Sequence, residues 1–235
     1  MHARFENPCP FQFKRDQYYQ LAKLGFFGEQ KMELLFGEII EKYPDDPADP
    51  SSRPFRFTRE QFHRMGELGF FDDRRVELVY GEIVALPPIR EAHVASVSLT
   101  ADWLRVACGE RYYVRIHAPL NMSVIDPLPD VAVVAGGPRD HLVTPTTALL
   151  VVEVADDTLM YDVGAKVELY ATAGVPEYWV IDLEHRQLLV FRDPRPLPAG
   201  LGATAYKTHL TLEPTESVSP RLAPGASILV SDLLP

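Results

Sequence analysis

Two carboxylates stand within or beside apolar segments that are typical of buried strands. Asp130 follows Pro129 and opens the run DVAVVA, and Glu153 interrupts the apolar run ALLVVEV at residues 148–154. A carboxylate in a buried strand carries a large desolvation cost unless it is paired or bound to a cation. If the two strands are neighbours, both carboxylates can point to one place and bind a hard divalent ion such as Mg²⁺. The pattern therefore predicts a metal site.

A lysine that could serve the same site lies downstream. Asp162, Lys166 and Tyr170 are spaced four residues apart, so one face of a helix would present all three. Lys166 could then reach the carboxylates and supply a fixed positive charge. Taken singly, Asp130 also fits an ordinary strand start, and Lys166 fits a solvent-exposed helix residue. Their joint presence, in this order, favours a catalytic set.

Several other kinds of site are missing from the sequence. It has no GxxxxGK[ST] phosphate loop, no HExxH, no paired CxxC and no GxSxG. The seven histidines are scattered along the chain with no pair at metal-ligand spacing, so a zinc site is not expected. The carboxylates and the lysine are thus the best candidates for chemistry.

The elements that must position these residues are a series of strands with helices between some of them. The sequence predicts strands at 112–117, 120–125, 130–135 and 148–154, and a strand pair at 177–182 and 187–192. The runs at 130–135 and 148–154 are almost wholly apolar, as expected for strands buried on both faces. Helices are predicted at 91–108, which is amphipathic, and at 162–173, which ends before Gly174. The fold class is therefore mixed α/β.

The N-terminal part of the chain contains one segment twice. LGFFGEQKMELLFGEII at residues 24–40 returns at 68–84 as LGFFDDRRVELVYGEIV. Each copy predicts a short helix followed by a hairpin, and Thr58 with Gln61 fits a capping box at the start of the second helix. The Pro- and Asp-rich residues 44–54 are expected to link the copies.

Only the second copy is followed by the candidate site residues. Glu33 of the first copy corresponds to Glu77 of the second, but no strand with Asp130 and no helix with Lys166 follows it directly. A two-stranded hairpin is marginal alone, so the first copy should pack on the core, extend a sheet edge or dock on another subunit. Competition with the second copy for the same site is an alternative.

Composition limits the classes of function. Across 235 residues, 46% are hydrophobic, 24% are charged and the net charge is −10. That charge argues against coating nucleic acid by bulk electrostatics, but it leaves room for an enzyme that acts at one local site. The longest apolar run is too short to cross a bilayer, and no N-terminal signal is evident. With only Cys9 and Cys108 and no CxxC, a cytoplasmic protein is expected.

The segments PDVAVV, VVEVADDT and YDVGAKVELYATAGVPEYWVID together resemble the Uma family of putative restriction endonucleases, within the PD-(D/E)XK nuclease superfamily. RRVELVYGEIV and EAHVASV match the opening of that family. The resemblance covers about residues 55–195 and the terminal ILVSDLLP. It implies a restriction-endonuclease-like core with a central mixed sheet flanked by helices, and a hydrolase that cleaves phosphodiester bonds with Mg²⁺ or Mn²⁺. The expected substrate is nucleic acid, with DNA favoured, and a homodimer is expected.

The resemblance also implies roles for individual residues. Asp130 and Glu153 would be catalytic acids and metal ligands, joined by Glu77 and by the carbonyl of Val154. Lys166 would take the place of the superfamily's Glu-x-Lys lysine, because Ala155 stands at the usual position. Tyr170 and Asp162 would position Lys166. No organic cofactor is expected.

The expected division of the chain has four parts. Residues 1–43 would be an extension that duplicates the helix and hairpin of 57–84, and 44–54 would be the linker. Residues 55–195 would form the nuclease-like domain, with 196–235 as a C-terminal strand and tail packed on it. Two other functions fit the same residues: a non-catalytic binding or scaffold protein that keeps the nuclease fold, and a metal-dependent hydrolase of a small phosphorylated molecule.

Overall fold

The computed structural model describes residues 8–42, 53–72, 74–122, 125–197 and 204–235. It divides into two compact units, Met1–Leu86 and Pro87–Pro235, and each is described by itself. The second copy of the repeat thus groups with the first copy, and not with the rest of residues 55–195. Most of the expected linker, residues 44–54, lies outside the described residues; its last two residues form a short strand. Among the described residues, no helix is long and apolar enough to cross a membrane.

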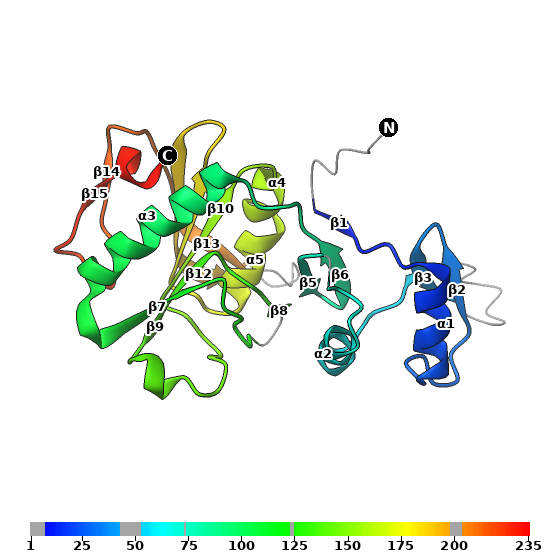
Figure 1. Cartoon of the computed structure of the whole chain (residues 1–235). Helices are drawn as coiled ribbons and strands as arrows, with labels where there is room; N and C mark the ends of the chain where they lie inside the picture. The colour runs from blue at the N-terminus through cyan, green and yellow to red at the C-terminus, as the bar shows by residue number, and fades with distance from the viewer. Residues whose placement is uncertain (1–7, 43–52, 73, 123–124, 198–203) are drawn as a thin grey trace. The chain divides into compact units, whose positions relative to one another are not determined.

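The first unit contains two helix-hairpin units, as the repeat predicts (Figure 1). The second helix begins at the predicted capping box: the Thr58 hydroxyl accepts a hydrogen bond from the Gln61 N–H, and the Gln61 side chain accepts one from the Thr58 N–H. The elements of this unit are β1 (Cys9–Pro10), α1 (Arg15–Lys23), β2 (Met32–Leu35), β3 (Glu38–Glu41), β4 (Arg53–Pro54), α2 (Arg59–Glu67), β5 (Val76–Val79) and β6 (Glu82–Ala85).

The second unit is built around a six-stranded mixed sheet in the order β13-β12-β11-β10-β9-β7. Only β10 and β11 are parallel, and the other neighbours are antiparallel. The elements are α3 (Glu91–Cys108), β7 (Tyr112–Ile116), β8 (Ile125–Asp126), β9 (Val131–Ala135), β10 (Leu150–Ala155), α4 (Leu159–Asp162), α5 (Ala165–Thr172), β11 (Glu177–Asp182), β12 (Gln187–Pro196), β13 (Thr204–Leu212), β14 (Ser217–Val218), β15 (Ile228–Leu229) and three 3₁₀ turns at Gly109–Arg111, Pro138–Asp140 and Val230–Leu233.

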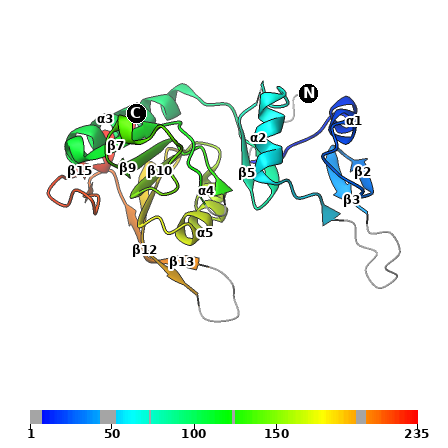
Figure 2. The same ribbon diagram turned by 90° about the horizontal axis from the view of Figure 1, so that it is seen from below.

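Helices cover both faces of this sheet, which confirms the predicted fold class (Figure 2). Val152 and Val154 of β10 belong to the same core as Val97 and Leu104 of α3. Side chains alternate between the faces of a strand, so Glu153 points away from that core. Tyr170 of α5 contacts Glu153 there. The C-terminal residues from Val218 to Leu234 contribute to the α3 side of the core.

The predicted helix at 162–173 is wrong in its continuity, because it is broken into α4 and α5. Gly164 lies between them with φ −102° and ψ −97°, outside the helical region. A Cβ at this position would lie 2.6 Å from the carbonyl oxygen of Met160, so only glycine fits the break. Sequence periodicity does not register such a break, since Gly within a helical pattern is often tolerated.

The predicted strand at 120–125 is also wrong in its described part. Residues 120–122 are not in a strand, and the Asn121 N–H bonds the carbonyl of Pro145 in a loop at 2.7 Å. Residues 123–124 lie outside the described residues, and β8 begins at Ile125. The other strands and the helix at 91–108 are found near their predicted positions.

A buried ion pair fastens β11 to β12 and to the C-terminal segment. Glu177 is fully buried, and its Oε1 accepts hydrogen bonds from Arg192 Nε at 2.7 Å and from the Trp179 indole at 2.9 Å. Its Oε2 accepts the backbone N–H of Arg221 at 2.7 Å. The carboxylate thus has several charge-assisted partners from different segments.

We expect Glu177→Gln to lower the free energy of unfolding by about 3 kcal/mol, because it leaves the Arg192 charge buried without its partner. Urea denaturation followed by tryptophan fluorescence measures the change. Asp193→Asn is the matched control, since it breaks the more exposed pair between Asp193 and Arg221. If both variants lose the same free energy of unfolding, burial does not make the Glu177–Arg192 pair more stabilising than the exposed pair.

Candidate active site

The two predicted carboxylates are neighbours across two strands. Val131 of β9 faces Val152 of β10 in an antiparallel pair, so the next position sets Asp130 opposite Glu153. The Asp130 backbone N–H also donates to Glu153 Oε2, at 3.4 Å. Both side chains are only about 4% exposed. The sheet register therefore brings the two acids together in a buried position.

Two imidazoles contact the same oxygen of Asp130. His93 Nε2 lies 3.0 Å from Asp130 Oδ1, and His117 Nε2 lies 3.2 Å from it. The other carboxylate oxygen, Oδ2, accepts the backbone N–H of Val154 at 2.8 Å. Asp130 thus has one oxygen fixed by the sheet and the other directed toward the two histidines.

Each histidine is positioned by a regular element. His93 lies in the first turn of α3, four residues before Val97, and so continues the buried face of that helix. His117 directly follows β7, and its N–H bonds the carbonyl of Asp130 at 3.1 Å. Its φ of +44° is in the left-handed region, which costs a non-glycine residue roughly 1–2 kcal/mol. The contacts around Asp130 hold this strained residue in place.

The surroundings of Asp130 keep it ionised. Burial alone would raise the pKa of this carboxyl group. The hydrogen bonds from His117 and His93, the charge on His93 and the Val154 N–H outweigh burial and hold the pKa of Asp130 well below its usual range. Asp130 is therefore a carboxylate at neutral pH and can act as an oxygen ligand.

Glu153 is joined to the lysine that sequence analysis selected. Lys166 Nζ lies 3.0 Å from Glu153 Oε1, and the Tyr170 hydroxyl donates to the same oxygen at 2.7 Å. Lys166 is 4% exposed and Tyr170 is fully buried. The lysine thus reaches the carboxylates from α5 although Ala155 occupies the superfamily's usual lysine position.

Lys166 also contacts a second acid, Asp162. Asp162 Oδ1 is 3.4 Å from Lys166 Nζ, and its Oδ2 accepts a hydrogen bond from the Thr158 hydroxyl. The Tyr178 hydroxyl donates to the Asp162 backbone carbonyl at 3.0 Å. Despite the break at Gly164, Asp162 and Lys166 therefore face each other as the four-residue spacing predicts.

The formal charges of this cluster favour a cation. Asp130, Glu153 and Asp162 are acids, and Lys166 contacts Glu153 and Asp162. Among these four groups the acids outnumber the lysine by two. A divalent ion bound beside the acids would offset part of their negative charge.

The available ligand atoms include both nitrogen and oxygen, and both can bind a divalent metal. The ligand atoms of His93, His117 and Asp130 lie within 4.8 Å of one another, and Glu153 adjoins this group through its contact with the Asp130 backbone. Imidazole nitrogens suit transition metals better than Mg²⁺, which prefers oxygen ligands. A site with two imidazoles therefore fits a transition-metal ion more closely than Mg²⁺.

Two further metal ligands were predicted, Glu77 and the Val154 carbonyl. Glu77 is buried in β5 and belongs to the first unit, and its role as a metal ligand stays a prediction. Val154 contacts Asp130 through its N–H, and the role of its carbonyl likewise stays a prediction.

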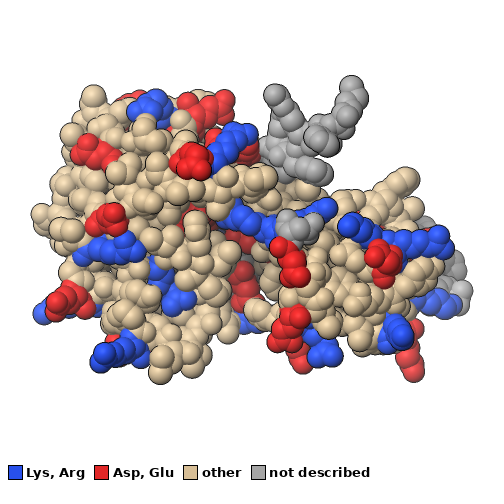
Figure 3. Space-filling model, in the orientation of Figure 1, with Lys and Arg blue, Asp and Glu red and all other residues tan. Residues whose placement is uncertain are grey.

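Arg74, Arg75, Arg115 and Arg139 are cations of the kind that could contact a phosphate. Arg115 Nη2 instead donates to the Pro119 carbonyl at 3.1 Å, and the Arg74 guanidinium lies 5.5 Å from the centre of the Phe11 ring. On the face drawn in Figure 3, the side chains of Lys and Arg are interspersed with those of Asp and Glu. These contacts do not assign phosphate binding to any of the four.

The sequence did not mark His93 and His117 as possible ligands, because the two residues are far apart in the chain. His93 and His117 meet only through the packing of α3 against β7 and β9. One signal was present: His93 continues the apolar stripe of a clearly amphipathic helix, where a polar residue would need a buried partner. Nothing comparable marked His117.

The comparisons with known proteins agree with this fold. The crystal structure of a "putative nuclease belonging to DUF820" from Anabaena variabilis ATCC 29413 aligns with a TM-score of 0.60. The alignment covers 77% of this chain and 97% of that chain, and 16% of the aligned residues are identical. At that identity the likeness shows a shared fold. No curated protein matches the chain.

The family comparison covers most of the chain. Residues 59–231 match the model of the Uma2 family, which is described as "Putative restriction endonuclease". The match begins in the helix of the second copy and includes every residue of the cluster around Asp130 and Glu153. With more than half of its length matched, the chain belongs to the Uma2 family.

Proposed function

We propose that this protein is a divalent-metal-dependent nuclease that hydrolyses phosphodiester bonds, with DNA as the favoured substrate. The observation that carries the proposal is one buried cluster that contains Asp130, directly before β9, Glu153 of β10 and Lys166 of α5. Two acids and a lysine are the set that the PD-(D/E)XK resemblance requires, and membership of the Uma2 family supports the same reaction.

Asp130, Glu153, His93 and His117 are the residues that would hold the metal, with Glu77 and the Val154 carbonyl as further proposed ligands. A bound divalent ion supplies Lewis-acid polarisation of a phosphate oxygen and lowers the pKa of water. The ionised Asp130 provides a ligand oxygen without prior loss of a proton. The Val154 N–H fixes the orientation of that carboxylate by binding its other oxygen.

Lys166 would stabilise negative charge that develops on the phosphate. Its ammonium group lies 3.0 Å from Glu153, one of the proposed metal ligands, so a phosphate bound at the metal would lie near its charge. Tyr170 would act as a positioning residue for Glu153, and Asp162 for Lys166. The two carboxylates that contact this ammonium group offset the cost of burying it.

We expect Glu153→Gln and Lys166→Met each to lower Mn²⁺-dependent plasmid cleavage by roughly 100-fold or more, because each removes a charge next to the reacting phosphate. Gel assays of supercoiled plasmid and of single-stranded DNA measure the loss. Lys207→Met, at an exposed position on β13, is the control for removing a lysine. Circular dichroism checks that each variant is folded.

Two outcomes would count against a nuclease. If the wild type cleaves a small phosphodiester such as bis(p-nitrophenyl) phosphate but no nucleic acid, the protein is a small-substrate hydrolase. If it binds Mn²⁺ but cleaves neither class, or fails to bind the ion, the scaffold function is favoured.

We expect Tyr170→Phe to weaken Mn²⁺ binding about 10-fold, because Glu153 loses the hydroxyl that fixes its Oε1. Isothermal titration calorimetry with Mn²⁺ measures the affinity. Tyr206→Phe is the control: it removes another buried hydroxyl, which bonds the Val175 carbonyl instead. An equal effect of the two substitutions would show that Tyr170 acts only through general stability.

We expect the wild type to bind Mn²⁺ at least 10-fold more tightly than Mg²⁺, because imidazole is a poor ligand for Mg²⁺. His93→Gln should remove most of that difference and should change Mg²⁺ binding little. Titrations of both ions into both proteins make the comparison. Unchanged Mn²⁺ affinity in the variant would exclude His93 as a ligand.

A further inference from the structure

The strand that precedes each copy of the repeat pairs with the hairpin of the other copy. β1, before the first copy, lies antiparallel to β6 of the second, with Cys9 facing Ala85. β4, before the second copy, lies antiparallel to β3 of the first, with Arg53 facing Glu41. Adding 44 to Cys9 and to Glu41 gives Arg53 and Ala85, so the two pairings are equivalent.

The hydrogen bonds that follow these strands repeat with the same shift. Phe11 donates its N–H to the Ile83 carbonyl at 2.7 Å, and Phe55 donates to the Ile39 carbonyl at 2.8 Å. Two residues later each segment returns to its own copy, where Phe13 bonds Gly37 and Phe57 bonds Gly81, both at 2.7 Å. Each copy therefore makes the same backbone hydrogen bonds to the other copy.

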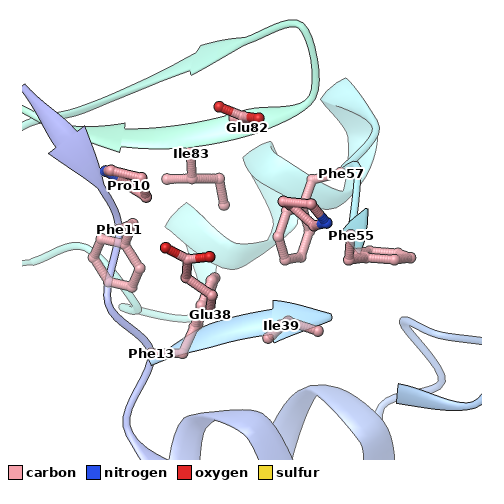
Figure 4. Close-up of a pocket in the computed structure, with 10 residues that line it drawn as sticks. Pro10, Phe11, Phe13, Glu38, Ile39, Phe55, Phe57, Glu82 and Ile83 are labelled. Carbon is pink, nitrogen blue, oxygen red and sulfur yellow. The ribbon is translucent and has the colours of Figure 1, made fainter. Parts of the chain in front are cut away.

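These equivalent pairings give the two copies an approximate two-fold symmetry, and the side chains between the copies follow it. The Phe13 and Phe57 rings, which are equivalent, contact each other with centroids 5.6 Å apart. A cavity of about 70 Å³ between the copies is lined by five equivalent pairs (Figure 4). The pairs are Pro10 and Pro54, Phe11 and Phe55, Phe13 and Phe57, Glu38 and Glu82, and Ile39 and Ile83.

An interface in which the same patch contacts itself is the kind that a symmetric homodimer forms. Here both halves of such an interface come from one chain. The match to the Uma2 family begins at residue 59, so the family's own region contains the second copy alone. The first copy therefore supplies what a second subunit would otherwise have to provide.

We infer that the first unit is an internally closed pseudo-dimer, in which the first copy occupies the surface where the helix and hairpin of a second chain would dock. The apolar core explains why that surface needs a cover: it contains Phe11, Phe13, Phe55 and Phe57, all buried. An exposed patch of this composition would drive association. Closing it within the chain makes a second subunit unnecessary at this surface.

The competing arrangement is a domain swap, in which the first copy of one chain pairs with the second copy of another. The two arrangements have the same local contacts and differ only in which chain supplies each copy. A covalent link between the copies distinguishes them, because it joins either one chain to itself or two chains to each other.

Ala85→Cys in the full chain places a thiol opposite the native Cys9. Facing residues in an antiparallel pair have Cα atoms about 4.5–5.5 Å apart, which is within reach of a disulfide. After mild oxidation of dilute protein, we expect a disulfide that leaves the chain monomeric on a denaturing, non-reducing gel and removes two free thiols. Cys9→Ser with Ala85→Cys is the control for bonds to Cys108.

The equivalent pair offers an independent repeat of the test. Glu41→Cys with Arg53→Cys, in a Cys9→Ser background, should give the same intrachain bond. Disulfide-linked dimers in both designs would overturn the inference in favour of the swap. Absence of any disulfide in both would also overturn it, since the strands would then not be paired. A dimer formed through another surface would not alter the result on a denaturing gel.

Discussion

The desolvation of two neighbouring carboxylates is the constraint on which the second unit depends. β9 and β10 pair so that Asp130 and Glu153 face each other, nearly inaccessible to water. Such a pair is stable only if positive or hydrogen-donating groups surround it. The groups come from every side: histidines from α3 and the end of β7, a backbone N–H from β10, and Lys166 with Tyr170 from α5.

The local backbone adapts to bring these groups into contact. The helix that carries Lys166 is broken at Gly164, and the break turns α5 while leaving Asp162 beside the lysine. His117 adopts a left-handed backbone conformation at the end of β7 and contacts Asp130 through both its backbone and its imidazole. Unfavourable conformations of this kind persist where surrounding contacts determine them, and they cluster at functional sites.

In the first unit, by contrast, apolar packing is the dominant constraint. A helix with one hairpin buries too little surface to be stable alone. The second copy of the same segment supplies a matching surface, and phenylalanines from both copies fill the space between them. Each copy thus buries its apolar surface against the other.

Sequence alone predicted the mixed fold class, most of the strands, and the grouping of Asp130, Glu153 and Lys166 in space, because buried strands and an interrupting acid leave a strong local pattern. It did not predict the break at Gly164, which depends on the distance to the Met160 carbonyl. It missed His93 and His117, because only tertiary packing brings residues from α3 and β7 to one carboxylate. The sequence did not show what the first copy packs against, because a repeated segment does not indicate which surface it covers.

A crystal structure of the wild type grown with Mn²⁺ is the most direct test of the central claim, that this buried cluster is a cation site. We expect one strong anomalous-difference peak in direct contact with Asp130 and at least one of His93 and His117. Soaking with Mg²⁺ in place of Mn²⁺ controls for the identity of the peak. A well-ordered cluster with no anomalous peak, and with Lys166 still paired to Glu153, would contradict the account.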